Sequence, residues 1–263
     1  MTIMIQRVKD KAIIVTGSTQ GIGRDIAYRL AAEGANVTIV GRNQDLGNQV
    51  VESIRKQYDV DALYVEADIS NVEQCHNLVN KTIDRFGGLY GLCNNAGVFP
   101  RFSLAEISEE KYEMAFGVNV KGAFFCSQAA INHFIATGKG GSIVNVGSTH
   151  ARWGYRHYGA YSVSKGGLYA LTMHIARNYA SDNVRSNSVL VGWVLSEGEL
   201  AMRQSLGENE EMLLEFGKKW LPMGGHQTGA DNAAAVAFLM SKEARFITGC
   251  EIDVSGGTSS LAR

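Results

Sequence analysis

Short apolar runs alternate with longer amphipathic segments from the start of the chain. The runs are rich in β-branched residues, as is typical of strands that are buried on both faces. The segments between them carry apolar residues at helical spacing, and the first example is Ile22, Ile26 and Leu30. The pattern predicts strands at residues 12–15, 36–40, 62–65, 89–93 and 141–147, and further helices at residues 46–58 and 72–86.

The regular order of strand, helix and strand predicts the fold class. Strands that are joined through helices pair in parallel, and right-handed crossovers place the helices on both faces of the sheet. We therefore predict an α/β fold with a doubly wound parallel sheet. The chain has 263 residues, 45% of them hydrophobic, which is enough for one domain over residues 1–263, with residues 1–10 as an N-terminal tail.

Charge and cysteine content exclude several kinds of partner. A formal net charge of −1 gives no electrostatic reason to expect nucleic acid or a membrane surface, so a small molecule is the expected ligand. The four cysteines lack metal-ligand spacing, and we expect buried, reduced thiols and no metal site. The N-terminus is too short in apolar length for a signal peptide, so we expect a soluble, cytoplasmic protein.

Glycines gather where the first strand passes into the first helix. Gly17, Gly21 and Gly23 have the spacing Gly-x-x-x-Gly-x-Gly, which differs from the common Gly-x-Gly-x-x-Gly pattern but occupies the same strand-to-helix position. Glycine allows the backbone to approach a pyrophosphate, which the N–H groups and the dipole of the following helix attract. The turn therefore predicts dinucleotide binding.

Tyr161 and Lys165 lie four residues apart, so a helix would place them on one face. A nearby ammonium favours the phenolate, and we expect it to lower the pKa of Tyr161 from about 10 toward neutrality, where the phenol can carry a proton. Ser148 follows the strand predicted at residues 141–147, where a hydroxyl would face a cleft. Taken alone, the Tyr and Lys pair could equally be a surface pair.

Three segments, residues 16–23, 94–97 and 141–168, resemble the motifs of the short-chain dehydrogenase/reductase family in order and spacing, and the resemblance extends from about residue 11 to residue 257. It implies a single-domain, Rossmann-type oxidoreductase that moves a hydride between a nicotinamide cofactor and a carbonyl or alcohol carbon. The residues that match the family's catalytic group are Asn119, Ser148, Tyr161 and Lys165.

The resemblance also implies a role for each member of this group. Ser148 would bind the substrate oxygen, and Tyr161 would exchange its proton. Lys165 would lower the tyrosine pKa and hold the nicotinamide ribose. Asn119 would link Lys165 to solvent through a water, although a structural hydrogen bond fits its local sequence equally.

The residues that the resemblance places against the cofactor are Gly17, Thr19, Gln20, Gly21, Ile22, Gly23, Arg42, Asp68, Ile69, Asn95, Ala96, Gly97, Tyr161, Lys165, Val194 and Ser196. Gly41 and Arg42 leave no carboxylate at the end of the second strand, and a guanidinium there can bind a 2′-phosphate. NADP(H) is therefore favoured, and NAD(H) stays possible because Arg42 could be a solvated turn residue. Asp68 could instead be the N-cap of the next helix.

Two segments are expected to face the substrate, a small polar carbonyl or alcohol such as a sugar, a polyol or a keto compound. Hydrogen-bond donors beside aromatic surface indicate the candidate contacts. These are Ser148, His150, Trp153, His157 and Trp193. Residues 193–220 are predicted to form a lid, whose apolar stripe of Met212, Phe216 and Trp220 could instead pack on a partner subunit.

Three positions depart from the family pattern: Val191 replaces a proline, Ser196 a threonine and Ser255 an aspartate. None belongs to the catalytic group. The resemblance implies a homotetramer, or a homodimer, formed through the helices that carry Asn119 and Tyr161. An NAD(H)-dependent catabolic alcohol dehydrogenase and a dinucleotide-binding regulator without turnover remain alternatives, whereas an epimerase or dehydratase of the same superfamily usually has a longer chain.

Overall fold

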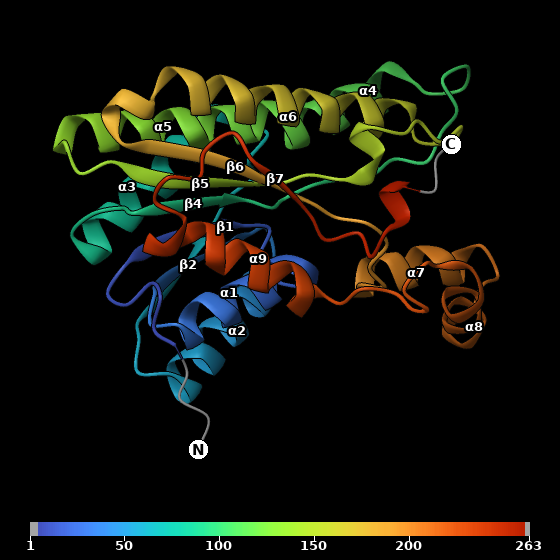
Figure 1. Cartoon of the computed structure of the whole chain (residues 1–263), viewed down its shortest axis with the longest axis horizontal. Helices are drawn as coiled ribbons and strands as arrows, with labels where there is room; N and C mark the ends of the chain where they lie inside the picture. Colours follow the sequence, from blue (N-terminus) through green and yellow to red (C-terminus); the bar gives the residue numbers. More distant parts are fainter. Residues whose placement is uncertain (1–4, 261–263) are drawn as a thin grey trace.

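Seven parallel strands form one sheet within residues 5–260, the part of the chain that this computed structural model describes (Figure 1). The strands are β1 (Ala12–Thr16), β2 (Asn36–Gly41), β3 (Ala62–Glu66), β4 (Gly91–Asn94), β5 (Gly141–Val146), β6 (Val184–Leu190) and β7 (Glu251–Asp253). Their order in the sheet is β3-β2-β1-β4-β5-β6-β7, and every pairing is parallel. The predicted doubly wound parallel sheet is confirmed.

Helices cover both faces of the sheet, and each face buries its own apolar cluster (Figure 1). One layer contains α1 (Gly21–Ala32), α2 (Gln44–Gln57) and α9 (Gly229–Met240). The other contains α3 (Val72–Phe86), α4 (Glu109–Phe116), α5 (Ala123–Thr137) and α6 (Gly159–Asn178). Ile26 and Val236 are fully buried in the first cluster, and Leu78 and Phe134 are fully buried in the second. The two clusters hold the sheet between two rigid helical layers.

The order in which successive strands join the sheet reverses at β1, which pairs with β2 on one side and with β4 on the other. Crossovers on the two sides of this point run in opposite directions and leave a crevice at the carboxyl ends of the strands. The residues that follow β1 and β4, which are Gly17 and Asn95, meet at this crevice.

A separate helical unit follows β6 and projects beside the main body (Figure 1). It consists of α7 (Glu197–Ser205) and α8 (Glu210–Trp220), which together fill most of the segment predicted to be a lid. Within residues 5–260 no helix is both long enough and apolar enough to cross a bilayer.

Two expectations from the sequence need correction. Of the predicted N-terminal tail, residues 1–4 lie outside the described part, but Val8 is 1% exposed and its N–H donates to the Glu33 carbonyl, so residues near it pack against the end of α1. The cysteines were all expected to be buried, yet Cys250 is exposed. It lies just before β7, an edge strand that has a neighbouring strand on one side only.

Candidate active site

The turn from β1 into α1 brings its backbone close to the crevice. Gly17 and Gly21 have φ angles of 63° and 57°, a conformation that favours glycine. A Cβ on Gly17 would lie 2.8 Å from the Ala96 Cα, and one on Gly23 would lie 2.3 Å from the Gly17 carbonyl oxygen. The N-cap residue Gln20 gives α1 no side-chain hydrogen bond. A helix end without a cap from its own N-cap side chain fits the pyrophosphate of a dinucleotide.

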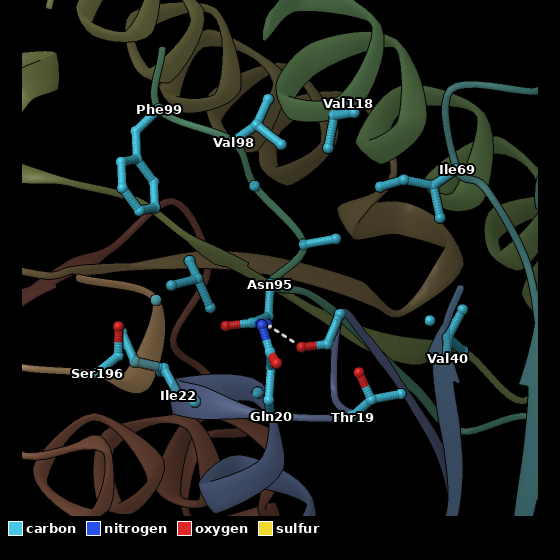
Figure 2. A pocket seen from close by; sticks show the side chains of 18 of the residues that line it. Thr19, Gln20, Ile22, Val40, Ile69, Asn95, Val98, Phe99, Val118 and Ser196 are labelled. Carbon is cyan, nitrogen blue, oxygen red and sulfur yellow. Dashed lines mark hydrogen bonds between the residues drawn. The ribbon is translucent and has the colours of Figure 1, made fainter. Parts of the chain in front are cut away.

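Asn95 fastens the loop after β4 to this turn, as Figure 2 shows. Its side-chain Nδ2 donates to the carbonyl oxygens of Thr16 and Gly17 at 2.9 and 3.1 Å. The backbone N–H groups of Asn95 and Ala96 both donate to the Thr16 hydroxyl, at 3.0 and 3.1 Å. The predicted cofactor residues Asn95, Ala96 and Gly97 all line the adjoining cavity.

A cavity of about 540 Å³ runs along the carboxyl ends of the strands. Figure 2 shows Val40, Ile69 and Val118 toward one end and Phe99 and Ser196 toward the other. The apolar end suits a planar base, and the glycine turn lies between the two ends. Predicted cofactor residues that line the cavity are Gly17, Thr19, Gln20, Gly21, Ile22, Gly23, Arg42, Asp68, Ile69, Asn95, Ala96, Gly97, Tyr161, Lys165 and Ser196. The residues present therefore fit a dinucleotide.

A second hollow, of about 700 Å³, opens beside the first at the start of α2 and is lined by Arg42, Gln20 and Asp45 among others. Arg42 is exposed at its edge. The Ser70 hydroxyl donates to Asp68 and lowers the pKa of that carboxyl, and the charge of Arg42 acts in the same direction. The N-cap of α3 is Asn71, so the alternative interpretation of Asp68 as that cap is wrong.

Strand β5 and helix α6 bring three predicted catalytic side chains together on the cavity wall. Ser148 lies just beyond β5, and Tyr161 lies in the first turn of α6, one turn before Lys165. The Ser148 hydroxyl and the Tyr161 phenol are hydrogen-bonded. Lys165 is 4% exposed, and its Nζ donates to the Val146 carbonyl at 2.8 Å and lies 5.7 Å from the centre of the Tyr161 ring.

Burial dominates the titration of this group. It raises the pKa of Tyr161 to about 12, against the opposing hydrogen bond from Ser148. Burial also lowers the pKa of Lys165 to about 8. The prediction that the pKa of Tyr161 falls toward neutrality is therefore wrong, because desolvation disfavours the phenolate. Tyr161 keeps its proton at neutral pH and can act as an acid.

Asn119 lies behind the cavity wall in a π-helical turn, η1 (Gly117–Gly122), between α4 and α5. Its Nδ2 donates to the Val98 carbonyl at 2.8 Å and to the Ser164 hydroxyl at 2.9 Å, and its Oδ1 accepts from the Val98 N–H at 2.8 Å. Both amide hydrogens are thus used within the protein, and the side chain does not line the cavity. The structural role left open by the sequence is confirmed, and the water link to Lys165 stays a prediction.

His150 lies close to the predicted catalytic group. Its ring centre is 5.3 Å from that of Tyr161, and the rings of Tyr155 and Tyr158 lie 4.7 and 4.9 Å away. Burial lowers the pKa of His150 to about 4, so the imidazole is neutral at pH 7. Its Nδ1 is buried without a protein partner among the described residues. His150 therefore combines a hydrogen-bonding group with an aromatic surface beside Tyr161.

The other predicted substrate residues are more dispersed. Trp193 belongs to the lid, where its Nε1 donates to Glu199 at 2.9 Å and the Arg203 guanidinium lies 4.6 Å from its ring centre. Trp153 is half-buried and His157 is exposed. None of these three side chains lines the cavity along the strand ends, which contains Ser148 but not the rest of the predicted substrate set.

Val194 was predicted to contact the cofactor but lies outside the cavity, because its backbone forms a bridge with Gln227.

The departures from the family pattern are accommodated in the fold. The Val191 carbonyl accepts the Thr149 N–H at 2.9 Å, and Ser255 accepts the Ser259 N–H at 3.1 Å.

Several cavity residues were missed from the sequence, and they include Val40, Val98, Phe99, Glu113, Met114, Val118 and Gly198. Val40 could have been found, since it ends a predicted strand at the edge where ligands bind. Val118 has no such signal, because an apolar residue within a helix is expected in the core.

Comparison with known proteins agrees with this geometry. Residues 17–259 match the family model described as Enoyl-(Acyl carrier protein) reductase. The chain is 35% identical over 251 residues to an uncharacterized oxidoreductase of Thermotoga maritima, covering 95% of this chain and 98% of that protein. It is 32% identical over 255 residues to Glucose 1-dehydrogenase 2 of Bacillus subtilis, covering 97% and 96% of the two chains.

Among solved structures, levodione reductase superposes with a TM-score of 0.91 at 27% identity and covers 97% of this chain and 100% of its own. The sequence matches include the glycine turn and the Ser148, Tyr161 and Lys165 group within one continuous region. The chain therefore belongs to the short-chain dehydrogenase/reductase family of oxidoreductases.

Proposed function

We propose that the protein transfers a hydride between NADP(H) and the carbonyl or alcohol carbon of a small polar substrate, with Tyr161 as acid and base. One observation carries this proposal: Ser148 and Lys165, which are buried, and Tyr161, which is half-buried, open on the same cavity as the glycine turn. A single cavity thus joins a phosphate-binding helix end to a proton donor.

The bound cofactor supplies or accepts the hydride. Ser148 donates a hydrogen bond to the substrate oxygen and stabilises negative charge that develops there. Tyr161 gives its proton to that oxygen during reduction and takes it back during oxidation. Lys165, a buried cation near the ring, stabilises the phenolate that forms.

The preference for NADP(H) is supported by the second hollow. Arg42 lies exposed at its edge, the N-terminus of α2 faces the same space, and Gly41 brings no carboxylate to the end of β2. A guanidinium and a helix N-terminus both favour a 2′-phosphate. We expect Arg42→Ala to weaken NADPH binding about tenfold or more while leaving NADH binding nearly unchanged. An equal loss for both cofactors would refute this role.

For the substrate, His150 offers a neutral hydrogen-bonding group beside aromatic rings. Such surroundings suit a sugar, a polyol or a keto compound. Glucose 1-dehydrogenase 2, one of the relatives, is named for a sugar. This agrees with the class of substrate proposed here.

We also propose that copies of the chain associate through α5 and α6. Their outer faces expose Phe124, Ile135, Tyr169 and Met173, large apolar side chains that a partner would cover. Sedimentation of the purified protein tests this: a homotetramer or a homodimer is expected, and a monomer at micromolar concentration would refute it.

The decisive experiment is a titration with NADPH and NADH followed by nicotinamide fluorescence, and then absorbance of the reduced cofactor with a panel of sugars, polyols and ketones. Turnover with NADPH is expected, and Tyr161→Phe should abolish it without changing the Kd for NADPH. A preference for NADH would support the alternative of a catabolic alcohol dehydrogenase. Binding without turnover on any substrate would support a regulator.

A further inference from the structure

Glu197, the first residue of α7, lies at the N-terminus of α1. Its carboxylate lies beside Gly21, whose backbone N–H lowers the pKa of the carboxyl, and a Cβ built on Gly21 would lie 3.8 Å from Oε2. Arg24, in the first turn of α1, pairs with the same carboxylate at 2.8 Å between Nη2 and Oε1. A side chain of the lid thus binds the helix end that we assign to the cofactor's pyrophosphate.

A pyrophosphate and this carboxylate compete for the same site. Gly21 has one backbone N–H, and two anions in contact with it would repel each other. The Glu197 side chain is 54% exposed, so it can rotate into solvent without opening the core. Arg24 also lies 3.5 Å from Asp25, which gives the guanidinium another partner once Glu197 leaves.

We propose that Glu197 is an internal competitor of the cofactor, which holds α7 on the N-terminus of α1 until a pyrophosphate displaces it. The inference rests on the proposed binding of a dinucleotide and assigns a residue that links this binding to the lid. Ser196 and Gly198, on either side of Glu197, line the cavity, so release of Glu197 moves part of its wall. Trp193 and Glu199 belong to the same segment, and the substrate region changes with it.

The test compares the wild type with Glu197→Gln and with Glu211→Gln, a control that removes the same charge from an exposed position in the first turn of α8. The Kd for NADPH is measured by nicotinamide fluorescence, and amide hydrogen exchange is followed over residues 196–206 without cofactor. Glu197→Gln is expected to lower the Kd about five- to tenfold and to accelerate exchange in α7, whereas Glu211→Gln changes neither.

An unchanged or weaker affinity in Glu197→Gln, with NADPH bound normally by the wild type, would overturn the competitor role and leave the proposed function intact. Equal tightening in both variants would also overturn it, since the effect would then come from net charge alone. Failure of the wild type to bind either NADPH or NADH would refute the proposed function, and the role of Glu197 with it.

Discussion

Replacing Lys165 by methionine should stabilise the protein at neutral pH while abolishing its activity. Lys165 is 4% exposed, and burial lowers its pKa from 10.5 to about 8. A shift of this size corresponds to about 3 kcal/mol of preference for the neutral amine in the folded state. At pH 7 the folded protein must hold the charged form in spite of this preference, so the site is destabilising there.

The dependence on pH separates this effect from other consequences of the substitution. Because the folded pKa is depressed, the unfolded chain binds more protons between about pH 8 and pH 10.5, and the stability contributed by Lys165 rises with pH in that window. The wild type should therefore gain about 2 kcal/mol relative to Lys165→Met between pH 7 and pH 9.5. Lys165→Met also loses the hydrogen bond to the Val146 carbonyl. This loss changes the difference in unfolding free energy between the two proteins by a similar amount at every pH, and it has much less effect on how that difference depends on pH.

Urea unfolding followed by tryptophan fluorescence at pH 7, 8, 9 and 9.5 measures the difference, at one protein concentration to keep any association constant. Lys81→Met serves as the matched control, since Lys81 is exposed on α3. The control should show no such dependence on pH. A difference between wild type and Lys165→Met that stays constant from pH 7 to pH 9.5 would refute the claim that burial depresses the lysine pKa.

Two further substitutions test the architecture of the site. Gly17→Ala should destabilise the protein by about 1–2 kcal/mol or more and raise the Kd for NADPH at least tenfold, because φ is 63° and a Cβ would lie 2.8 Å from the Ala96 Cα. Gly138→Ala is its control in urea unfolding and titration, since φ is again 63° but nothing lies within 4 Å, and NADPH binding should not change. Asn119→Leu should lower the free energy of unfolding by about 2–3 kcal/mol. The reason is that it leaves Val98 and Ser164 without their amide partner. A variant with full stability but no activity would show instead that the amide acts in turnover.

Most of the fold could be predicted because the first strands of the chain are short, mainly apolar runs. β1, β2 and β3 each extend one residue beyond the predicted ends, and α3 has the predicted bounds. β6 gave no such signal, because its sequence VRSNSVL places polar residues in the core. Asn187, for example, donates to the Ile247 carbonyl at 2.9 Å and accepts the Cys250 N–H at 3.0 Å. Buried polar groups with tertiary partners leave no periodicity to detect.

The candidate site also contains residues that could be predicted from the sequence and others that could not. Residues that act through local geometry, such as Gly17 in its turn or Tyr161 and Lys165 on one helix face, could be found from spacing. Contacts between distant segments could not be found. Nothing in the local sequence joins Glu197 to Gly21, and nothing in η1 distinguishes the structural amide of Asn119 from one that contacts a ligand. These depend on packing between elements.

Burial also explains why the predicted fall in the Tyr161 pKa is absent from the resting site. While Tyr161 is protonated, desolvation disfavours phenolate and ammonium separately, which accounts for a phenol pKa of about 12 beside an amine pKa of about 8. In the mechanism that we propose, the phenolate and the ammonium carry opposite charges in a poorly solvated site once the proton has moved to the substrate oxygen, with the Lys165 Nζ 5.7 Å from the ring centre. Their attraction is then far stronger than it would be in water and offsets much of both desolvation penalties. In this proposed mechanism Lys165 acts mainly while the proton is transferred, and its contribution should appear in kcat rather than in the resting titration of Tyr161.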